Sequence, residues 1–250
     1  MQKKPTIIAL IPARSGSKRI SDKNIRLFQG HPLIAYTIAS ALQSRIFANV
    51  IVSTDSKRYA AIAEHYGAEV PFLRPVEYSG DKSPDIEWIA HTLKKLKDNN
   101  TCSDCFCILR PTNPFRSSDT IKRAWMEFLS DRSIHSLRAV ELCAQHPGKM
   151  WIVAGNRMHP LIPLGPEDLP WHSQPYHSLP EVYVQNASLE ICWSRIVFDT
   201  KTIAGTAIRP FFTKNYEGFD LNFERDWRIA EDLISQGHVR LPMVKQKPFQ

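Results

Sequence analysis

Long apolar runs are missing from this chain of 250 residues, and none approaches the roughly 18 residues that a membrane-spanning helix needs. The apolar stretch that follows the first lysines is too short for a signal peptide and continues directly into a polar motif. We therefore expect a cytoplasmic protein with no membrane partner. The sequence also lacks internal repeats and low-complexity segments, which argues against a repeat architecture.

Cysteine is scarce and odd in number: the chain has five, and three of them are clustered at Cys102, Cys105 and Cys107. A structural zinc site needs a fourth ligand at a suitable spacing, whereas Cys143 and Cys192 are isolated. We therefore expect reduced thiols rather than a metal site, with Cys107 packed in an apolar strand.

Uninterrupted runs of lysine or arginine are also absent, although basic residues outnumber acidic ones by 32 to 25 and the formal net charge is +7. A surplus of this kind attracts nucleic acid, membrane surfaces or small anions. Because no nucleic-acid-binding motif accompanies it, we expect an anionic small-molecule substrate and no nucleic-acid partner. The hydrophobic fraction of 43% and the length suit one large globular domain.

The segment 7–24 carries the strongest local signal in the chain. Residues 7–11 are all apolar without alternation, which predicts a strand buried on both faces, and Pro12 ends it. The loop that follows matches neither the Walker nor the GxGxxG pattern. In sequence order it contains Arg14, Ser15, Gly16, Ser17, Lys18, Arg19 and Lys23. A cationic loop at the carboxyl end of a parallel strand suits a polyphosphate, and a solvated basic loop is the alternative.

Apolar periodicity predicts alternating strands and helices through residue 129. The expected strands are 49–53, 70–73 and 105–109, and the expected helices are 31–45, 56–66, 85–98 and 117–129. Together with the first strand, this order predicts an α/β fold with a mostly parallel, twisted sheet and helices on both faces.

The pattern changes near residue 133. Strands are expected at 133–140, 182–192 and 206–212, and helices at 196–200 and 224–235. Residues 141–184 are rich in proline, histidine and tryptophan and carry few helix signals. We therefore expect a single domain over 1–250, with a loop-rich or small β excursion at about 141–184.

Charged residues follow several expected strands and so gather at one edge of the sheet. Asp55 is either a partner for a metal or a cation, or the cap of the next helix. Arg74, Arg110 and Arg116 add positive charge at the same edge. His146 precedes a proline, where it serves either as a general base or in a structural turn.

Several motifs follow one another in a defined order over residues 6–236. They are IPARSGSKRISDKN at 11–24, VSTD at 52–55, RP at 74–75, LRPTNPFR at 109–116, HPGKMW at 146–151, QNASLE at 185–190 and FDLN at 219–222. This set resembles the cytidylyltransferase family that makes CMP-activated acidic sugars, the acylneuraminate and nonulosonate synthetases. The resemblance implies a Rossmann-like nucleotidyltransferase fold whose excursion serves dimerisation. It also implies CTP as co-substrate, an acidic sugar such as a sialic acid, Mg²⁺ and a homodimer.

The resemblance also assigns roles to individual residues of this chain. It implies catalytic roles for Arg14, Lys23 and Asp220. It implies nucleotide binding by Arg14, Ser15, Gly16, Ser17, Lys18, Lys23, Asn24, Arg74, Asp81 and Arg110. It implies sugar binding by Lys149, Tyr176, Tyr183, Gln185 and Asn186, and a magnesium site at Asp220 and Asn222.

The chain departs from the family pattern in three respects. Asn222 replaces the second aspartate of the metal pair, and its amide oxygen supplies no charge. Arg110 stands where the family has glutamine, and residues 174–186 lack the arginines that meet the sugar's carboxylate. Two alternatives therefore stay open: a nucleotidyltransferase that uses a sugar 1-phosphate and another nucleotide, or a nucleotide-binding homologue that does not catalyse.

Overall fold

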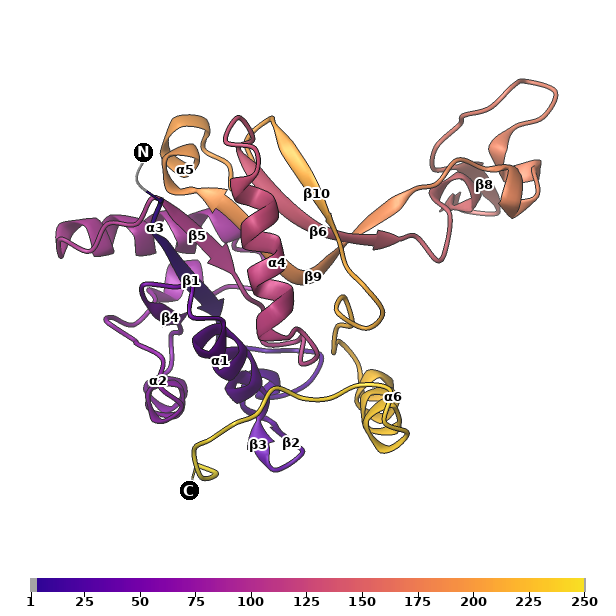
Figure 1. The fold of residues 1–250 in the computed structure, drawn as a ribbon. Coiled ribbons are helices and arrows are strands. Elements are labelled where there is room, and N and C mark those ends of the chain that lie inside the picture. Colours follow the sequence, from indigo (N-terminus) through magenta and orange to yellow (C-terminus); the bar gives the residue numbers. More distant parts are fainter. Residues whose placement is uncertain (1–3, 250) are drawn as a thin grey trace. The chain divides into compact units, whose positions relative to one another are not determined.

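A six-stranded sheet with the strand order β10-β6-β9-β5-β1-β4 forms the centre of the structure (Figure 1). The computed structural model describes residues 4–249. The strands are β1 (Ile7–Pro12), β4 (Val50–Ser53), β5 (Cys105–Ile108), β6 (Ser136–Leu142), β9 (Tyr183–Trp193) and β10 (Ile208–Phe212). β1 pairs in parallel with β4 and with β5, whereas β9 runs antiparallel to β5. The prediction of an α/β fold is confirmed, and the parallel strands are those around β1.

The helices occupy the predicted segments, with small shifts at their ends. They are α1 (Leu33–Ser44), α2 (Lys57–His65), α3 (Asp85–Asp98), α4 (Ser118–Leu129), α5 (Ser194–Thr200) and α6 (Glu224–Ser235). Ser56 caps α2 by accepting from the backbone N–H of Tyr59 at 3.4 Å, and Ser117 caps α4 in the same way. The alternative that Asp55 caps α2 is therefore wrong.

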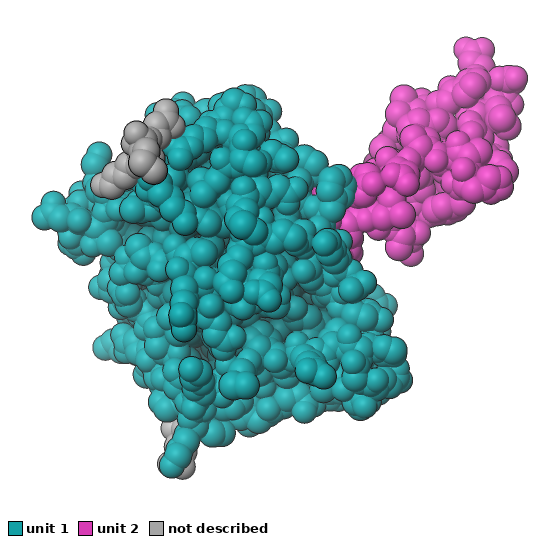
Figure 2. Space-filling model, viewed as in Figure 1, with its two compact units in different colours: residues 1–139, 186–250 teal, residues 140–185 magenta. Residues whose placement is uncertain are grey.

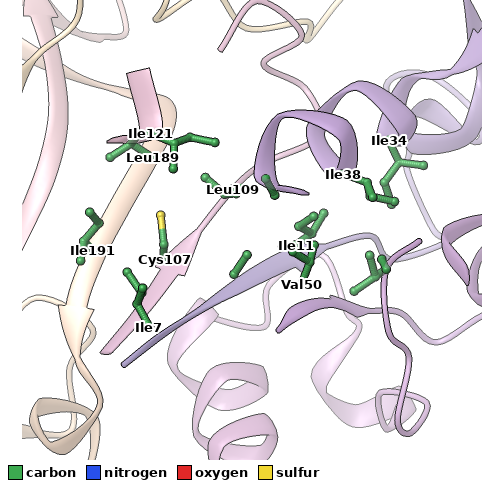
Figure 3. Packing of buried hydrophobic residues seen from close by; sticks show 14 of the residues in the cluster. Ile7, Ile11, Ile34, Ile38, Val50, Cys107, Leu109, Ile121, Leu189 and Ile191 are labelled. Atoms are coloured by element: carbon green, nitrogen blue, oxygen red, sulfur yellow. The ribbon is translucent and has the colours of Figure 1, made fainter. Parts of the chain in front are cut away.

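The strands are buried on both faces, as their apolar runs predicted. Ile7, Ala9 and Ile11 of β1 pack in one cluster with residues of α1, α2 and α4, part of which Figure 3 shows. Ile8 and Leu10 pack with residues of α3 and α5 in a second cluster. Successive side chains of a strand point to opposite faces, so each face of the sheet has its own layer of helices.

Three of the five cysteines belong to this core. Cys105, Cys107 and Cys192 are buried, and all five thiols are free. Cys107 lies in the first cluster and is 0% exposed, which confirms its predicted place in the core. Burial raises the pKa of the Cys107 thiol to about 12, so this thiol stays protonated at neutral pH.

The strand predicted at 70–73 does not form. The backbone makes one parallel bridge, between Ile51 and Glu69, and then leaves the sheet. Pro71 has no N–H to donate, so the ladder beside β4 stops there. The chain returns at Arg74, whose N–H donates to the carbonyl of Thr54 at 2.7 Å. This return places the arginine beside the end of β4.

Helix α6 is held by a third apolar cluster. Trp227 and Ala230 of α6 pack with Phe28, Leu33 and Leu221. Phe28 belongs to a short hairpin formed by β2 (Leu27–Phe28) and β3 (His31–Pro32). The packing fixes the segment just before α6, which contains Asp220 and Asn222.

The chain divides into two compact units, coloured separately in Figure 2: residues 1–139 with 186–250, and residues 140–185. The smaller unit contains the hairpin of β7 (Trp151–Ala154) and β8 (Arg157–Pro160) and three 3-10 turns. The last residues of β6 and the first residues of β9 also belong to it, and its remaining segments are irregular. Within residues 4–249, no helix has the length and apolar character that crossing a membrane requires.

Candidate active site

A cleft of about 290 Å³ opens in the larger unit at the carboxyl ends of β1, β4 and β5. Nine of the predicted residues line it: Arg14, Ser17, Lys23, Asn24, Arg74, Asp81, Arg110, Asp220 and Asn222. A second hollow of about 470 Å³ shares Arg14, Ser17, Lys23, Asp81 and Asn222 with the first and adds Lys18 and Arg19. Residues that are up to two hundred positions apart in the sequence therefore meet at one edge of the sheet.

The loop after β1 is anchored by Asp55. The two carboxylate oxygens of Asp55 accept from the backbone N–H and the hydroxyl of Ser15, each at 2.8 Å. Asn24 donates its amide N–H to the carbonyl of Arg14 at 3.3 Å. Ser15 and Gly16 line neither hollow, whereas Ser17 lines both. Ser15 thus holds the loop in place and leaves the contacts with the cleft to its neighbours.

Asp81 pairs with two of the cations on this loop. Its carboxylate lies 2.5 Å from Arg14 and 2.5 Å from the ammonium of Lys18. Hydrogen bonds from Lys18 and then from Arg14 hold the pKa of Asp81 below its usual value. The carboxylate therefore occupies the two cations that were predicted to bind phosphate.

Lys23 extends from a short 3-10 turn towards the segment before α6. Its ammonium donates to the carbonyl of Leu221 at 3.0 Å and to the amide oxygen of Asn222 at 3.4 Å. Burial lowers the pKa of Lys23, and the nearby carboxylate of Asp220 opposes this shift. Arg19 also donates to the amide oxygen of Asn222, at 3.5 Å. Lys23 is thus a cation fixed in the wall of the cleft.

Asp220 has one bonded and one unbonded oxygen. Oδ2 accepts from the side-chain amide of Asn222. Oδ1 is buried, and within residues 4–249 it has no hydrogen-bond partner. Over the same residues, no three histidine, cysteine, aspartate or glutamate side chains are grouped closely enough to hold a metal ion. A divalent cation at this place would therefore depend on one carboxylate and on ligands from the substrate.

Arg74 lines the part of the cleft that the second hollow does not share. It is 5% exposed and donates to the hydroxyl and the carbonyl of Ser53, each at 2.9 Å. Its guanidinium lies 4.6 Å from the ring centre of Trp88, a cation–π contact. Burial lowers the pKa of Arg74 to about 10, so the side chain remains charged at neutral pH. This end of the cleft is aromatic and closely packed.

Arg110 bridges two carboxylates in the wall of the cleft. It donates to Asp85 at 2.5 Å and to Glu190 at 3.0 Å, and Glu190 also pairs with Arg138 at 3.0 Å. Burial by itself would lower the pKa of Arg110, but the charges of Asp85 and Glu190 outweigh it and raise the pKa. Arg110 is therefore part of a partly buried ion network, in which the Glu190 side chain is 6% exposed and those of Arg110 and Asp85 are each 30% exposed.

Arg116 does not add a cation to the cleft. It is 1% exposed and donates to the carbonyls of Ser188 and Arg110 and to the hydroxyl of Thr37. Burial lowers its pKa to about 10. The expectation that Arg116 contributes charge to the site is wrong, because its guanidinium is used to fix the loop after β5.

The predicted sugar-binding residues belong mainly to the smaller unit. Lys149 donates to the carbonyls of His172 and Gln174, at 3.2 and 2.6 Å. The hydroxyl of Tyr176 accepts from the backbone N–H of His146. The hydroxyl of Tyr183 donates to Glu181 at 2.9 Å. Gln185 ends this unit, and Asn186 begins the return of the chain to the larger one.

His146 has a structural position. Its ring accepts from the backbone N–H of Gly148 at 3.0 Å, and the other ring nitrogen lies 3.0 Å from the carbonyl of Pro180. The side chain is 5% exposed. Of the two predicted roles, the structural turn fits this geometry, because both ring nitrogens are bonded to backbone.

Sequence reasoning missed Asp85 and Glu190. Asp85 opens α3 and was assigned only to a helix start, and Glu190 lies in an apolar strand. A carboxylate inside an apolar strand needs a cationic partner, which is a signal that could have marked Glu190. Its partner, Arg110, lies 80 positions earlier, and the sequence gives no direct sign of that pairing.

Comparisons of sequence identify similar proteins along most of the chain. The family model for cytidylyltransferases matches residues 8–138. A CMP-N,N'-diacetyllegionaminic acid synthase from Legionella pneumophila is 33% identical over 234 residues, which cover 91% of this chain and 96% of that protein. An N-acylneuraminate cytidylyltransferase from Escherichia coli is 50% identical over 118 residues, which cover 47% of this chain and 27% of that protein.

Solved structures share the fold. A CMP:2-keto-3-deoxy-manno-octonic acid synthetase complexed with CTP has a TM-score of 0.67 at 16% identity, covering 93% of this chain and 99% of that one. A 4-diphosphocytidyl-2C-methyl-D-erythritol synthase from Anaerococcus prevotii has a TM-score of 0.59 at 13% identity, covering 92% and 99%. At these identities the likeness concerns the fold, and it confirms the predicted α/β class.

Proposed function

The chain belongs to the cytidylyltransferase family, and we propose that it activates an acidic sugar of the nonulosonate class with CTP, giving a CMP-sugar and pyrophosphate. The observation that carries the proposal is the cleft itself, where Arg14 and Lys23 line the same hollow as Asp220, and Lys18 and Arg19 line the second hollow. Similarity to the diacetyllegionaminate synthase over 91% of the chain supports the acceptor class.

The nucleotide would lie along the cleft. The aromatic end suits the base and ribose, because the partly exposed ring of Tyr78 lines it beside the buried Arg74 and Trp88. The cationic end, with Arg14, Lys18 and Lys23, suits the triphosphate. The predicted nucleotide-binding role of Asn24 is supported by its place in the lining of the cleft.

The reaction needs positioning and charge neutralisation rather than a protein nucleophile. The anomeric hydroxyl of the sugar attacks the α-phosphorus of CTP, and pyrophosphate leaves in line with the attack. The developing negative charge on pyrophosphate would be stabilised by Arg14 and Lys23, which we propose as catalytic residues. Both side chains line the two hollows of the cleft.

The residues present fit a magnesium ion that arrives with the nucleotide. Asp220 offers a buried carboxylate oxygen without a partner in the described part of the chain. When bound, Mg²⁺ would supply positive charge that offsets the charge of the phosphates. A site with one carboxylate and several substrate oxygens is common for this ion. We propose Asp220 as its ligand from the protein.

The sugar would be bound with help from a second copy of the chain. We propose that Lys149, Tyr176, Tyr183, Gln185 and Asn186 contact it, and that the unit 140–185 forms a homodimer. The hairpin in this unit exposes apolar side chains: Ile152 is 53%, Val153 71% and Met158 54% exposed. A second copy would bury them. The free cysteines support the proposed cytoplasmic location.

The experiment that tests the proposal is a matrix of pyrophosphate-release assays. CTP, UTP, GTP and ATP with Mg²⁺ are each combined with a panel of 2-keto acid sugars and sugar 1-phosphates. Release with CTP and a keto acid sugar alone supports the proposal and identifies the acceptor. Release with a sugar 1-phosphate, or with another nucleotide, would replace it with the first alternative. Triphosphate binding without release in every combination would favour a non-catalytic homologue.

A further inference from the structure

Asn222 lies between one anion and two cations of the cleft. Its amide nitrogen donates to Oδ2 of Asp220, and its amide oxygen accepts from Lys23 at 3.4 Å and from Arg19 at 3.5 Å. Lys23 makes a shorter bond, of 3.0 Å, to the carbonyl of the adjacent Leu221. A single side chain therefore joins the proposed metal ligand to the proposed catalytic cation.

Only one orientation of the amide satisfies these partners. An ionised carboxylate accepts hydrogen bonds, and ammonium and guanidinium groups donate them. The amide nitrogen of Asn222 must therefore face Asp220, and the oxygen must face Lys23 and Arg19. An aspartate at position 222 would have no proton to donate to Asp220, and the two carboxylates would repel each other unless a cation lay between them. Asparagine and aspartate are thus not equivalent at this position.

The backbone holds the side chain of Asn222 in this place. The N–H of Leu221 donates to the carbonyl of Thr112 at 2.8 Å, and Leu221 is 0% exposed. The N–H groups of Asn222 and Phe223 both donate to Oδ2 of Asp226, each at 2.8 Å. Asp226 lies in the first turn of α6. The backbone before Asn222 is fixed by the core, and the backbone after it is fixed by α6. Together these contacts restrict the position of the Asn222 amide.

We propose that Asn222 is a positioning residue, which aligns Asp220 and Lys23, and that it does not ligate Mg²⁺. Asp220 Oδ1 is then the one atom of this pair that the protein offers to the ion. With one carboxylate, the nucleotide-free protein binds divalent cations weakly, and the ion enters with the triphosphate. This inference rests on the proposed magnesium-dependent transfer of a cytidylyl group.

The first test measures metal binding without nucleotide or sugar, by the electron paramagnetic resonance of free Mn²⁺. Asn222→Asp adds a second carboxylate beside Asp220, so we expect it to bind Mn²⁺ about tenfold or more tightly than the wild type. Asn215→Asp, a matched control on an exposed turn, adds the same charge outside the cleft and leaves the affinity unchanged. Asn222→Ala removes the amide and should bind Mn²⁺ as the wild type does; a clear loss of Mn²⁺ affinity in this variant would overturn the proposal.

The second test separates alignment from ligation in the complete reaction. Asn222→Ala keeps the backbone N–H that Asp226 binds, but it removes the amide. We expect kcat to fall about a hundredfold while KM for CTP stays near the wild-type value, and excess Mg²⁺ not to restore kcat. Recovery at high Mg²⁺ would make Asn222 a ligand. Because the Mn²⁺ measurement needs no sugar, it decides the proposal even if the proposed acceptor is wrong.

Discussion

The two sides of the cleft hold their charges in different ways. On the side of β4 and β5, Arg74 is 5% exposed, and Arg110 bonds to Asp85 and to Glu190, whose side chain is 6% exposed. On the side of the β1 loop, the side chain of Lys18 is 82% exposed and shares one carboxylate with Arg14. The first side therefore buries Arg74 and Glu190, whereas Lys18 on the second side is a solvent-exposed cation. The Arg110–Asp85 and Arg14–Asp81 pairs are similarly exposed, at 30% and 30% against 32% and 28%.

This difference matches the two things that a nucleotidyltransferase must do. The base and ribose keep the same contacts throughout the reaction, so rigid residues around them hold the nucleotide in the orientation that the reaction needs. The phosphates change charge and separate during the reaction, so the cations around them must give up one partner for another. Breaking a buried ion network costs several kcal/mol, whereas exposed ion pairs contribute about 1 kcal/mol or less. The two sides should therefore respond differently to substitution.

The largest effect is expected at the cations that would face the leaving pyrophosphate. Lys23→Ala should lower kcat about a thousandfold, and Arg14→Ala about a hundredfold, because each removes a fixed positive charge from the transition state. Circular dichroism should be unchanged for both. Lys57→Ala, which removes an exposed lysine at the start of α2, is the control and should retain full activity. Wild-type turnover in either cleft variant would remove the β1 loop from the mechanism.

Removal of Arg110 should affect stability most. Arg110→Gln removes the cation that Asp85 and Glu190 share, and we expect the free energy of unfolding to fall by about 3 kcal/mol. Thermal unfolding measures the effect. The matched control is Arg58→Gln, which breaks an exposed pair with Asp22 and should cost less than about 1 kcal/mol.

If the Arg110 and Arg58 variants lose equal and small amounts of unfolding free energy, the distinction between the two sides is contradicted. A second variant tests the cause directly. Glu190 keeps its pair with Arg138 when Arg110 is removed, whereas Asp85 loses its cation. Asp85→Asn combined with Arg110→Gln removes this stranded charge, so the double variant should be more stable than Arg110→Gln alone. A double variant that is less stable would show that packing, and not the unpaired carboxylate, dominates.

The smallest effect is expected at Asp81. Its carboxylate must leave Arg14 and Lys18 before phosphate can reach them, so Asp81→Asn should tighten CTP and pyrophosphate binding about fivefold. Hydrogen bonds from these cations lower the pKa of Asp81 from 3.8, so the carboxylate is ionised at neutral pH and protonates only as the pH falls below that value. The difference between variant and wild type should thus stay constant between about pH 6 and pH 8.

Isothermal titration calorimetry with CTP and with pyrophosphate measures this difference. Lys82→Met is the control, because it changes a charge in the same loop without touching the Arg14 pair. Weaker binding by Asp81→Asn would mean that Asp81 supports the nucleotide rather than competing with it.

Much of the fold follows from local sequence patterns. The apolar run of β1 and the helix bounds depend on neighbouring residues, so periodicity was sufficient to predict them, whereas the cap considered at Asp55 is made by Ser56. The strand expected at 70–73 failed because Pro71 interrupts the ladder, a local signal that was present but outweighed by the apolar neighbours. The cationic cleft was also anticipated, since several of its cations follow the ends of parallel strands.

The partners of those cations could not be anticipated. Asp55 and Ser15 are 40 positions apart, and Arg110 and Glu190 are 80 apart. Which carboxylate meets which cation depends on the order of strands in the sheet, and β9 enters that order from far along the chain. Asn222 was expected as a weakened metal ligand. The amide's role between Asp220 and Lys23 emerged only when their relative positions were known.

The most direct test of the central claim follows the phosphorus atoms of CTP. CTP labelled at the α-phosphate, and in parallel at the γ-phosphate, is incubated with the protein, Mg²⁺ and the acceptor sugar, and the products are separated. Attack at the α-phosphorus predicts that the α label appears in a sugar-linked CMP product and the γ label in pyrophosphate. Release of the γ label as orthophosphate, or of the α label as free CMP without a sugar-linked product, would contradict the claim.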